Sequence, residues 1–316
     1  MTGWWHTPVM VGEALQLMRV RAGGKYVDTT LGGGGYAEKI LEALGPDGLV
    51  LGIDQDAEAI AFARQRLKDF PNFRPIHDNF SRLGDILDAH GIGEVNGIVF
   101  DLGVSSHLLD QPERGFSFQR EGPLDMRMDQ DLPDTAEHLV NDLSRPALEE
   151  ILREYGEEPF ASRIVRAIID RRQVSPLKTT KDLADLIYRA YPRKLRYGRT
   201  HPATRAFQAL RIAVNDELTA LQTALASGLD RLAPDGVLCC VSYHSLEDRI
   251  VKQFFQRHKA SRYGEEQDSR ALHILTPKPL VPSDQEVANN SRARSAKLRA
   301  AARVAPSTEP TRQFMP

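Results

Sequence analysis

The sequence predicts an α/β protein in which a Rossmann-like, mostly parallel sheet carries an inserted all-helical domain. Three observations lead to this fold class. Short, continuously apolar segments alternate with helical spacings up to about residue 105, which is typical of parallel strands buried on both faces. The alternation then gives way to a long run of helical patterns. It returns in the last third of the chain, where an apolar strand precedes another helix.

Each predicted strand follows from a short apolar run, and each helix from apolar residues at three- and four-residue spacing. The strands are Lys25–Asp28, Leu49–Asp54, Phe73–His77, Gly97–Asp101 and Val237–Val241, and the helices between them are Tyr36–Leu44, Ala57–Leu67, Leu83–Ala89 and Leu246–His258. Three of the strands end in an acid: Asp28, Asp54 and Asp101. Ligands of such sheets bind at the carboxyl ends of the strands, so we expect these acids near a site.

The middle of the chain predicts the insertion. Ser105–Pro133 is rich in glycine, proline and charge and has no clean period, as in a long functional or flexible loop. Capping patterns at Asp134 and Thr179 then start short helices, and Pro202 begins one long helix that continues through Leu225. We therefore expect a discontinuous sheet domain at 1–105 and 211–316 and a helical insertion at 106–210.

Composition excludes several classes of protein. The chain has 316 residues, with 41 Lys+Arg against 43 Asp+Glu and a formal net charge of −2, which argues against a disordered chain or a fibre. Cys239 and Cys240 are adjacent in an apolar segment and cannot link distant parts of the chain, so we expect a reducing, cytoplasmic location. No signal peptide is indicated, and no segment has the roughly 20 apolar residues of a membrane helix.

The small net charge hides an uneven distribution. Residues 105–162 carry 14 acidic and 5 basic side chains, a net charge of −9, whereas residues 163–211 carry 13 basic and 3 acidic ones, a net charge of +10. Residues 291–304 add five basic side chains and no acidic one. Either basic segment alone is as compatible with a solvated helix face, but two of them favour an anionic macromolecular partner.

A glycine-rich loop after the first strand predicts a nucleotide-type cofactor. Gly32–Gly35 lies between a strand and a helix, and Asp54 follows Gly35 by 19 residues at the end of the next strand. A carboxylate there can hold the ribose of either NAD or S-adenosylmethionine. The loop lacks G-x-G-x-x-G but fits D-x-(G/T)-x-G-x-G, the form of methyltransferases that use S-adenosylmethionine, with Thr30 in the first glycine place.

Methyl transfer needs alignment and a nucleophile with an available lone pair, and we assign no metal ligand. Methylation of pyrimidine C5 would need a cysteine, but Cys239 and Cys240 lie in a strand and are better explained as buried structural residues. Methylation of an exocyclic amine needs an acceptor for the N–H. Asp101 and His244 are the candidates, although each also has a structural interpretation, and the usual DPPY-type tetrapeptide of amino methyltransferases is absent.

Over nearly its whole length the chain resembles MraW, the ribosomal small-subunit methyltransferase H family. The matching runs are His6–Val9 (HTPV), Asp28–Tyr36 (DTTLGGGGY), Asp101–Ser106 (DLGVSS), Glu113–Phe118 (ERGFSF), Gly122–Asp129 (GPLDMRMD), Tyr155–Glu158 (YGEE), His201–Arg205 (HPATR), Ser242–Val251 (SYHSLEDRIV) and Ser291–Ser295 (SRARS). The resemblance implies a Rossmann-like methyltransferase with a helical insertion. It also implies that S-adenosylmethionine methylates N4 of a decoding-site cytosine of 16S rRNA in the small ribosomal subunit.

The resemblance also implies site residues. Gly34, Gly35 and Tyr36 would contact S-adenosylmethionine from the loop, and Asp54 would hold its ribose. Phe80 would lie beside the adenine, and Asp101 would approach the methionine end or the reacting centre. The family often has Gln at the place of Leu108, so only a backbone or packing contact is expected there. Tyr36 and Tyr243 stand where the family often has His and Phe.

The basic segments predict the RNA contacts. Arg193–Arg199 (RKLRYGR) places cations beside Tyr191 and Tyr197, which suits phosphate binding and base stacking. The residues expected to bind RNA are Arg193, Lys194, Arg196, Arg199 and Arg205 in the insertion, and Arg292 and Arg294 near the C-terminus. The sequence leaves the oligomeric state open, with a dimer as one option.

Two other functions remain open from the residues alone. A ribosome-assembly factor could keep S-adenosylmethionine as a structural ligand, and a single-turnover assay with labelled cofactor would separate it from an enzyme. A nicotinamide-dependent dehydrogenase could also use the loop and Asp54. The missing third glycine argues against a dehydrogenase, as does the absence of an obvious hydride-transfer site.

Overall fold

A computed structural model describes residues 8–198, 200–260 and 270–305, which divide into two compact units. The sheet unit contains residues 8–54, 58–103 and 221–305, and the helical unit contains Gln55–Ala57 and Val104–Ala220. The predicted boundaries, 105/106 and 210/211, differ from these. The second is wrong, because it falls inside a helix that spans Thr204–Asn215.

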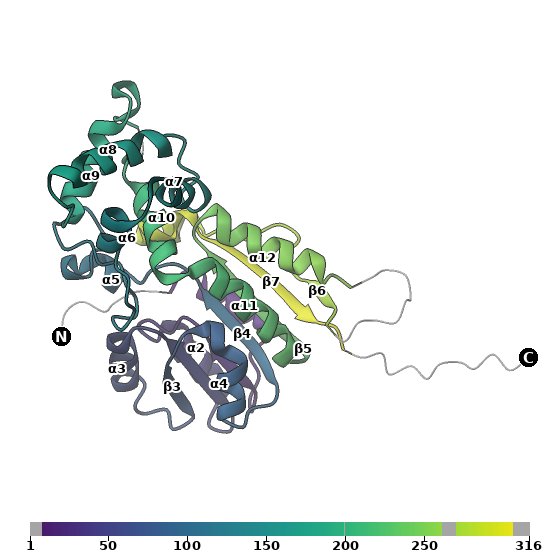
Figure 1. The fold of residues 1–316 in the computed structure, drawn as a ribbon. Coiled ribbons are helices and arrows are strands. Elements are labelled where there is room, and N and C mark those ends of the chain that lie inside the picture. Colours follow the sequence, from purple (N-terminus) through teal and green to yellow (C-terminus); the bar gives the residue numbers. More distant parts are fainter. Residues whose placement is uncertain (1–7, 199, 261–269, 306–316) are drawn as a thin grey trace, which may run out of the picture. The chain divides into compact units, whose positions relative to one another are not determined.

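The sheet unit is built on a seven-stranded sheet in the order β3-β2-β1-β4-β5-β7-β6 (Figure 1). Its strands are β1 (Lys25–Asp28), β2 (Leu49–Asp54), β3 (Phe73–His77), β4 (Val95–Asp101), β5 (Leu232–Ser242), β6 (Leu272–Ile274) and β7 (Lys297–Arg303). The first five are parallel, and β7 runs antiparallel to both β5 and β6. The predicted fold class, a Rossmann-like mostly parallel sheet with helices, is therefore confirmed.

Helices cover both faces of this sheet, because each strand presents alternate side chains to opposite sides. The helices of the unit are α1 (Val11–Met18), α2 (Gly35–Leu44), α3 (Ala57–Arg66), α4 (Leu83–Ala89), α11 (Glu217–Arg231), α12 (Ser245–Arg257) and α13 (Asp284–Asn289). One apolar core holds residues of α1, α2 and α3, and a second holds residues of α4, α11 and α12. Cys239 lies in the first core and Cys240 in the second, so the two thiols face opposite ways.

Part of the C-terminal basic segment, Lys297–Arg303, is a strand of the sheet, which the sequence did not predict. Arg299 on β7 is buried, and its Nε lies 2.6 Å from Asp248 Oδ1 of α12. Lys297 Nζ lies 3.2 Å from the other oxygen of the same carboxylate, and Arg303 pairs with Glu94. Lys297, Arg299 and Arg303 have no acidic residue nearby in sequence, but each forms an ion pair with one in the folded chain. These three strand residues therefore have a structural role in the sheet.

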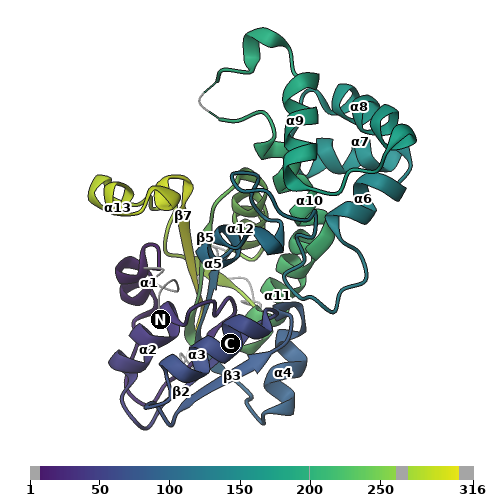
Figure 2. The ribbon, with the colours of Figure 1, turned by 90° about the vertical axis from the view of Figure 1, so that its left-hand side faces the viewer.

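The helical unit has its own apolar core, and Figure 2 shows the helices that contribute to it. Its elements are α5 (Ser106–Asp110), α6 (Ala136–Asp142), α7 (Arg145–Glu154), α8 (Ala161–Val174), α9 (Thr180–Ala190) and α10 (Thr204–Asn215), and short 3₁₀ turns at Pro112–Arg114 (η2) and Arg193–Leu195 (η3). The single long helix predicted from Pro202 to Leu225 is wrong. Asp216, at a φ of 46°, separates α10 from α11. No helix in the described ranges is long and apolar enough to cross a membrane.

The segment 105–133, predicted as a long loop, contains α5 and η2 and is tied to the rest of the helical unit. Asn215 of α10 accepts a bond from Met128 N at 2.8 Å and donates one to Met126 O at 2.8 Å. Arg114 forms a buried ion pair with Asp56, at 3.4 Å, and its Nη2 donates to the carbonyls of Arg127 and Met128. These bonds fix the backbone of a segment whose sequence shows no regular period.

Candidate active site

Asp28 organises the glycine-rich loop of the sheet unit. It is fully buried at the end of β1, and its two oxygens accept bonds from Thr30 N at 3.3 Å and from Ala37 N at 3.1 Å. Since Ala37 lies in the first turn of α2, the carboxylate joins strand, loop and helix start. The loop is also bonded to the neighbouring strands, because Thr29 Oγ1 donates to Val99 O and Leu31 N donates to Ile53 O.

Two of the glycines are required by the geometry of the loop. Gly34 has a φ of 77°, in the left-handed region that side chains disfavour, and a Cβ there would come 3.2 Å from Leu67. A Cβ on Gly35 would come 2.9 Å from the Pro8 ring. The loop therefore presents bare backbone at the start of α2, where the sequence predicts the cofactor.

Asp54 is held by the same loop. Its Oδ2 accepts a bond from Gly32 N at 2.7 Å, which fixes the carboxylate at the end of β2, beside the glycines. Phe80 begins a 3₁₀ turn after β3 and packs edge-on against Phe100 of β4, with ring centroids 6.1 Å apart. The parallel order β3-β2-β1-β4 thus brings the predicted ribose and adenine residues to the carboxyl edge of the sheet.

Asp101 ends β4 at the same edge and has two partners that the sequence did not reveal. Its backbone N–H donates to Thr30 Oγ1 at 2.7 Å, which ties it to the glycine loop. Its Oδ1 accepts a bond from the Tyr243 hydroxyl at 2.8 Å. The only sequence signal for this second contact was the position of Tyr243 just after a strand that neighbours β4.

Burial makes this edge of the sheet unfavourable for bare negative charge. It raises the pKa of Asp28 to about 7, and the charges of Asp101 and Asp54 add to this rise. Burial likewise raises the pKa of Asp101 to about 7, opposed by the Tyr243 hydrogen bond and reinforced by Glu247. Three acids gathered at one edge fit a cationic ligand better than an anionic one.

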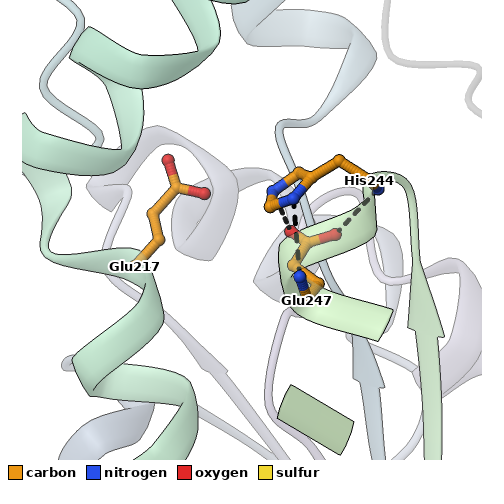
Figure 3. Close-up of side chains that lie close together, drawn as sticks. All are labelled: Glu217, His244 and Glu247. Atoms are coloured by element: carbon orange, nitrogen blue, oxygen red, sulfur yellow. Dashed lines mark hydrogen bonds and ion pairs between the residues drawn. The ribbon is translucent and has the colours of Figure 1, made fainter. Parts of the chain in front are cut away.

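His244 caps a helix. Its Nδ1 accepts a long bond from Glu247 N at 3.5 Å, and Glu247 Oε2 accepts from His244 N at 3.3 Å, which together form a capping box at the start of α12 (Figure 3). The Nε2 atom lies 3.1 Å from Glu247 Oε1. The imidazole therefore has a structural role beside the catalytic one predicted for it.

Tyr36 and Leu108 offer less to a cofactor than the sequence suggested. The Tyr36 side chain is buried, and its hydroxyl donates to Val9 O, so only its backbone can take part in the loop's contacts. Leu108 belongs to the helical unit, where its side chain lies in the core and its N–H donates to Ser105 Oγ at 3.2 Å. We leave Leu108 out of the site proposed below.

The basic segment of the helical unit divides into exposed and engaged side chains. Arg193 and Lys194 are exposed in η3. Arg196 donates to the carbonyls of Tyr191 and Arg189 at the end of α9 and lies over the Tyr188 ring, 5.3 Å from its centroid. Arg205 is exposed and donates to Glu157 O at 3.0 Å.

The two tyrosines expected to stack on bases differ. Tyr197 is 85% exposed, whereas Tyr191 is only 8% exposed and donates its hydroxyl to Glu158 at 2.6 Å. The expectation for Tyr191 is therefore wrong, because its ring belongs to the core. Near the C-terminus, Arg292 and Arg294 are exposed in a 3₁₀ turn at Ser291–Ser295. Arg199 lies outside the described residues.

The chain matches a known protein family along nearly its whole length. A sequence model of the MraW methylase family matches residues 3–304. The chain belongs to this family. Two relatives named ribosomal RNA small subunit methyltransferase H, from Geobacter sulfurreducens and Halothermothrix orenii, are 50% and 48% identical to it over 307 residues. The alignments cover 95% of this chain and 99% and 98% of the relatives.

This MraW methylase is a methyltransferase that uses S-adenosylmethionine, and its residues fit that cofactor. Leu67 and Pro8 occupy the places of a Cβ at Gly34 and Gly35, so the loop keeps bare backbone at the start of α2, as the glycine-rich loops of such cofactor sites do. Asp54 ends β2 beside the glycines, at the place where sites of this type carry the acid that binds a ribose. The raised proton affinity of Asp28 and Asp101 suits a ligand that carries a sulfonium and an ammonium group, whereas the pyrophosphate of NAD would add negative charge.

Proposed function

We propose that this methylase transfers a methyl group from S-adenosylmethionine to N4 of a decoding-site cytosine of 16S rRNA in the small ribosomal subunit. The observation that carries the proposal is Asp101, whose backbone N–H is bonded to Thr30 of the glycine loop and whose carboxylate lies at the end of β4. Its pKa of about 7 suits an acceptor of an amine proton near neutral pH. The names of the two relatives support an rRNA substrate.

The residues of the sheet unit hold the cofactor in this proposal. S-adenosylmethionine, when bound, supplies a methyl group made electrophilic by its sulfonium. The backbone at Gly34, Gly35 and Tyr36 would contact it, Asp54 would accept hydrogen bonds from the ribose, and Phe80 would pack against the adenine. These contacts restrict the orientation of the donor, which is the main contribution an enzyme makes to an in-line transfer.

Asp101 acts on the acceptor. Its ionised carboxylate accepts a hydrogen bond from the exocyclic amine, which directs the nitrogen lone pair toward the methyl group. As the N–C bond formed, the bond between the methyl carbon and the donor sulfur would break and leave a neutral thioether. The amine nitrogen would become positive and lose one proton to the Asp101 carboxylate, so the product would be a neutral N4-methylcytosine. His244 is the alternative acceptor, and its place in the capping box makes it the weaker candidate.

The direct test is mass analysis of 16S rRNA from cells with and without the gene for this chain. We expect N4-methylcytosine at one decoding-site position in the first RNA and unmodified cytosine in the second. Re-expression of the wild-type chain should restore the mark, whereas the Asp101→Asn variant should not. An unchanged modification pattern, or a mark on another atom or nucleotide, would contradict the proposal.

The exposed cations of η3 are proposed to bind the RNA backbone. Arg193 and Lys194 are exposed, and the aromatic ring of Tyr197 and the side chain of Leu195 are exposed beside them, by 85% and 53%. Cations next to exposed apolar groups are typical of surfaces that neutralise phosphates and stack on unpaired bases. Arg199, Arg205, Arg292 and Arg294 remain further proposed contacts.

Charge reversal at Arg193 and Lys194 should weaken RNA binding and reduce its salt dependence. The logarithm of the binding constant falls with the logarithm of the salt concentration, and loss of two phosphate contacts should make this slope less steep by about one to two. Arg196 is not suitable for this test, because its bonds to two helix-end carbonyls make its loss a folding defect as well. Binding of a decoding-site RNA fragment across a salt series measures the effect.

The control for this experiment reverses two exposed cations of α12, Lys252 and Arg257, and so changes the net charge by the same amount. We expect a smaller loss of affinity and an unchanged slope for the control. Equal slopes for the wild type and the η3 variant would show that η3 does not contact phosphates.

The cytoplasm is the proposed site of the reaction, since small ribosomal subunits are there. Both cysteines are buried free thiols in the structure, which suits a reducing compartment.

A further inference from the structure

Tyr243 is built into the sheet unit so that its hydroxyl reaches Asp101. The hydroxyl donates to Asp101 Oδ1 at 2.8 Å. The backbone N–H of Tyr243 donates to Glu247 Oε2 at 2.8 Å, and this bond fixes Tyr243 between β5 and α12. The ring packs beside Gly103, which has a φ of 97°, and a Cβ on this glycine would come 3.3 Å from the ring, so the position favours glycine.

The groups that face Asp101 explain what this bond does. Glu247 from α12 and Asp28 from β1 are acids, and their charges oppose ionisation of Asp101. Tyr36 of α2 and Cys239 of β5 also couple to its charge, but burial keeps both of them neutral by raising their pKa values. The Tyr243 hydroxyl acts in the opposite direction, because a donor that faces a carboxylate stabilises the ionised form.

We propose that Tyr243 is a positioning residue for Asp101. Its hydroxyl holds Oδ1 of the carboxylate in place and favours the ionised form. The other oxygen, Oδ2, is then the one that accepts the amine proton. The inference rests on the proposed function, in which Asp101 is the proton acceptor. Tyr243 itself touches neither cofactor nor substrate in this scheme. It acts only through the orientation and proton affinity of the carboxylate.

The test is the pH profile of methyl transfer for Tyr243→Phe, which removes the hydroxyl and keeps the ring beside Gly103. A hydrogen bond to a charged group corresponds to a shift of about one to two pH units in the midpoint. The midpoint should therefore move upward by that amount. At pH 7 the variant should be slower by about tenfold in kcat, and the two enzymes should converge above about pH 9.

Tyr26→Phe is the matched control. Tyr26 is another buried tyrosine of the sheet unit, and its hydroxyl accepts a bond from Arg21 N rather than meeting an acid. Its loss should leave the midpoint of the pH profile unchanged. An unchanged midpoint for Tyr243→Phe as well, or a loss of rate that is equal at every pH, would overturn the proposal.

A second measurement keeps the inference separate from the proposed function. Infrared or carbon-13 NMR titration of the Asp101 carboxyl, in protein without cofactor or RNA, reads its protonation directly. Tyr243→Phe should raise the titration midpoint, and an identical midpoint in both proteins would refute the role of Tyr243. If the wild type methylates no RNA while the carboxyl midpoint still moves, the proposed function fails and the effect of Tyr243 on Asp101 stands.

Discussion

Asp101→Asn is expected to slow methyl transfer by about two to four orders of magnitude, the usual contribution of a proton acceptor in the transition state. The substitution keeps the local structure, because an amide oxygen can still accept from Tyr243 and the backbone bond to Thr30 is unaffected. Single-turnover transfer from labelled S-adenosylmethionine to small-subunit RNA measures the loss. Full activity with unchanged cofactor affinity would remove Asp101 from the reaction.

The same variant should be more stable than the wild type above neutral pH. The pKa of Asp101 is about 7 in the folded chain, against an ordinary value of 3.8, so the folded state binds the proton more tightly. Stability therefore falls as pH rises from about 4 to 7. Asn cannot ionise, so it removes the cost of a buried charge at this position. The free energy of unfolding should therefore rise by roughly a few kcal/mol at pH 8, as the size of the pKa shift implies, and should hardly change at about pH 4.

His244→Ala distinguishes a helix cap from a catalytic base in the same assays. Loss of an N-cap costs about 1 kcal/mol of stability, and we expect this loss with most of the transfer rate retained. Denaturant unfolding together with the single-turnover assay gives both values. A rate loss as large as that of Asp101→Asn would restore His244 as the proton acceptor.

Arg114→Ala should destabilise the helical unit by about 3–5 kcal/mol, since it removes the positive charge that pairs with the buried Asp56 carboxylate. Arg114 and Asp56 are only 3% and 4% exposed, and the Arg114 side chain also bonds two carbonyls of the 105–133 segment. Guanidinium denaturation followed by far-UV circular dichroism measures the loss, because this unit is helical.

Two further variants test the cause. Arg145→Ala breaks an exposed pair with Glu149 one helical turn away, and should cost no more than about 0.5 kcal/mol. Replacing both buried partners, as Arg114→Met with Asp56→Leu, should recover much of the lost stability because no buried charge remains. A double variant as unstable as Arg114→Ala would show that the carbonyl bonds, rather than the charge pair, dominate.

The parallel half of the sheet could be predicted because burial on both faces leaves continuous apolar runs such as Leu49–Asp54. The search for continuous apolar runs did not predict β7. Its sequence, KLRAAAR, has alanines instead of β-branched residues and three basic side chains, and it becomes a strand because Asp248 neutralises the buried Arg299. That partner lies 51 residues away in sequence, so no local pattern could reveal it.

Helix breaks and loop anchors also depended on tertiary contacts. Heptad-like apolar spacing continues across Asp216, yet this residue adopts a left-handed conformation that ends α10. Asn215, beside it, bonds the backbone at Met126 and Met128. The polar segment 105–133 looked like a free loop in sequence because its order comes from such distant partners.

The cofactor loop was the most predictable part of the site, since strand, glycines and acid are close together in sequence. The residues proposed to act on the methyl acceptor were less predictable. Asp101 stood out as a strand-terminal acid, but its hydroxyl partner Tyr243 lies 142 residues later. Tyr191 and Tyr197 looked alike in sequence, and only the Glu158 contact distinguishes the core ring from the exposed one.

The strand order has a consequence for how the chain is made. Strands β3, β2, β1 and β4 leave the ribosome first, but the inner partner of β4 is β5, which follows only after the whole helical unit has been synthesised. Until then β4 is an apolar edge, the kind of edge that pairs with other chains. The sheet is complete only after β7 has been synthesised, and β7 lies close to the end of the described residues. A nascent chain that stalls between β4 and β5 would therefore expose β4, and one that stalls between β5 and β7 would expose β5 as the edge of the sheet. We expect this protein to depend on chaperones during its synthesis.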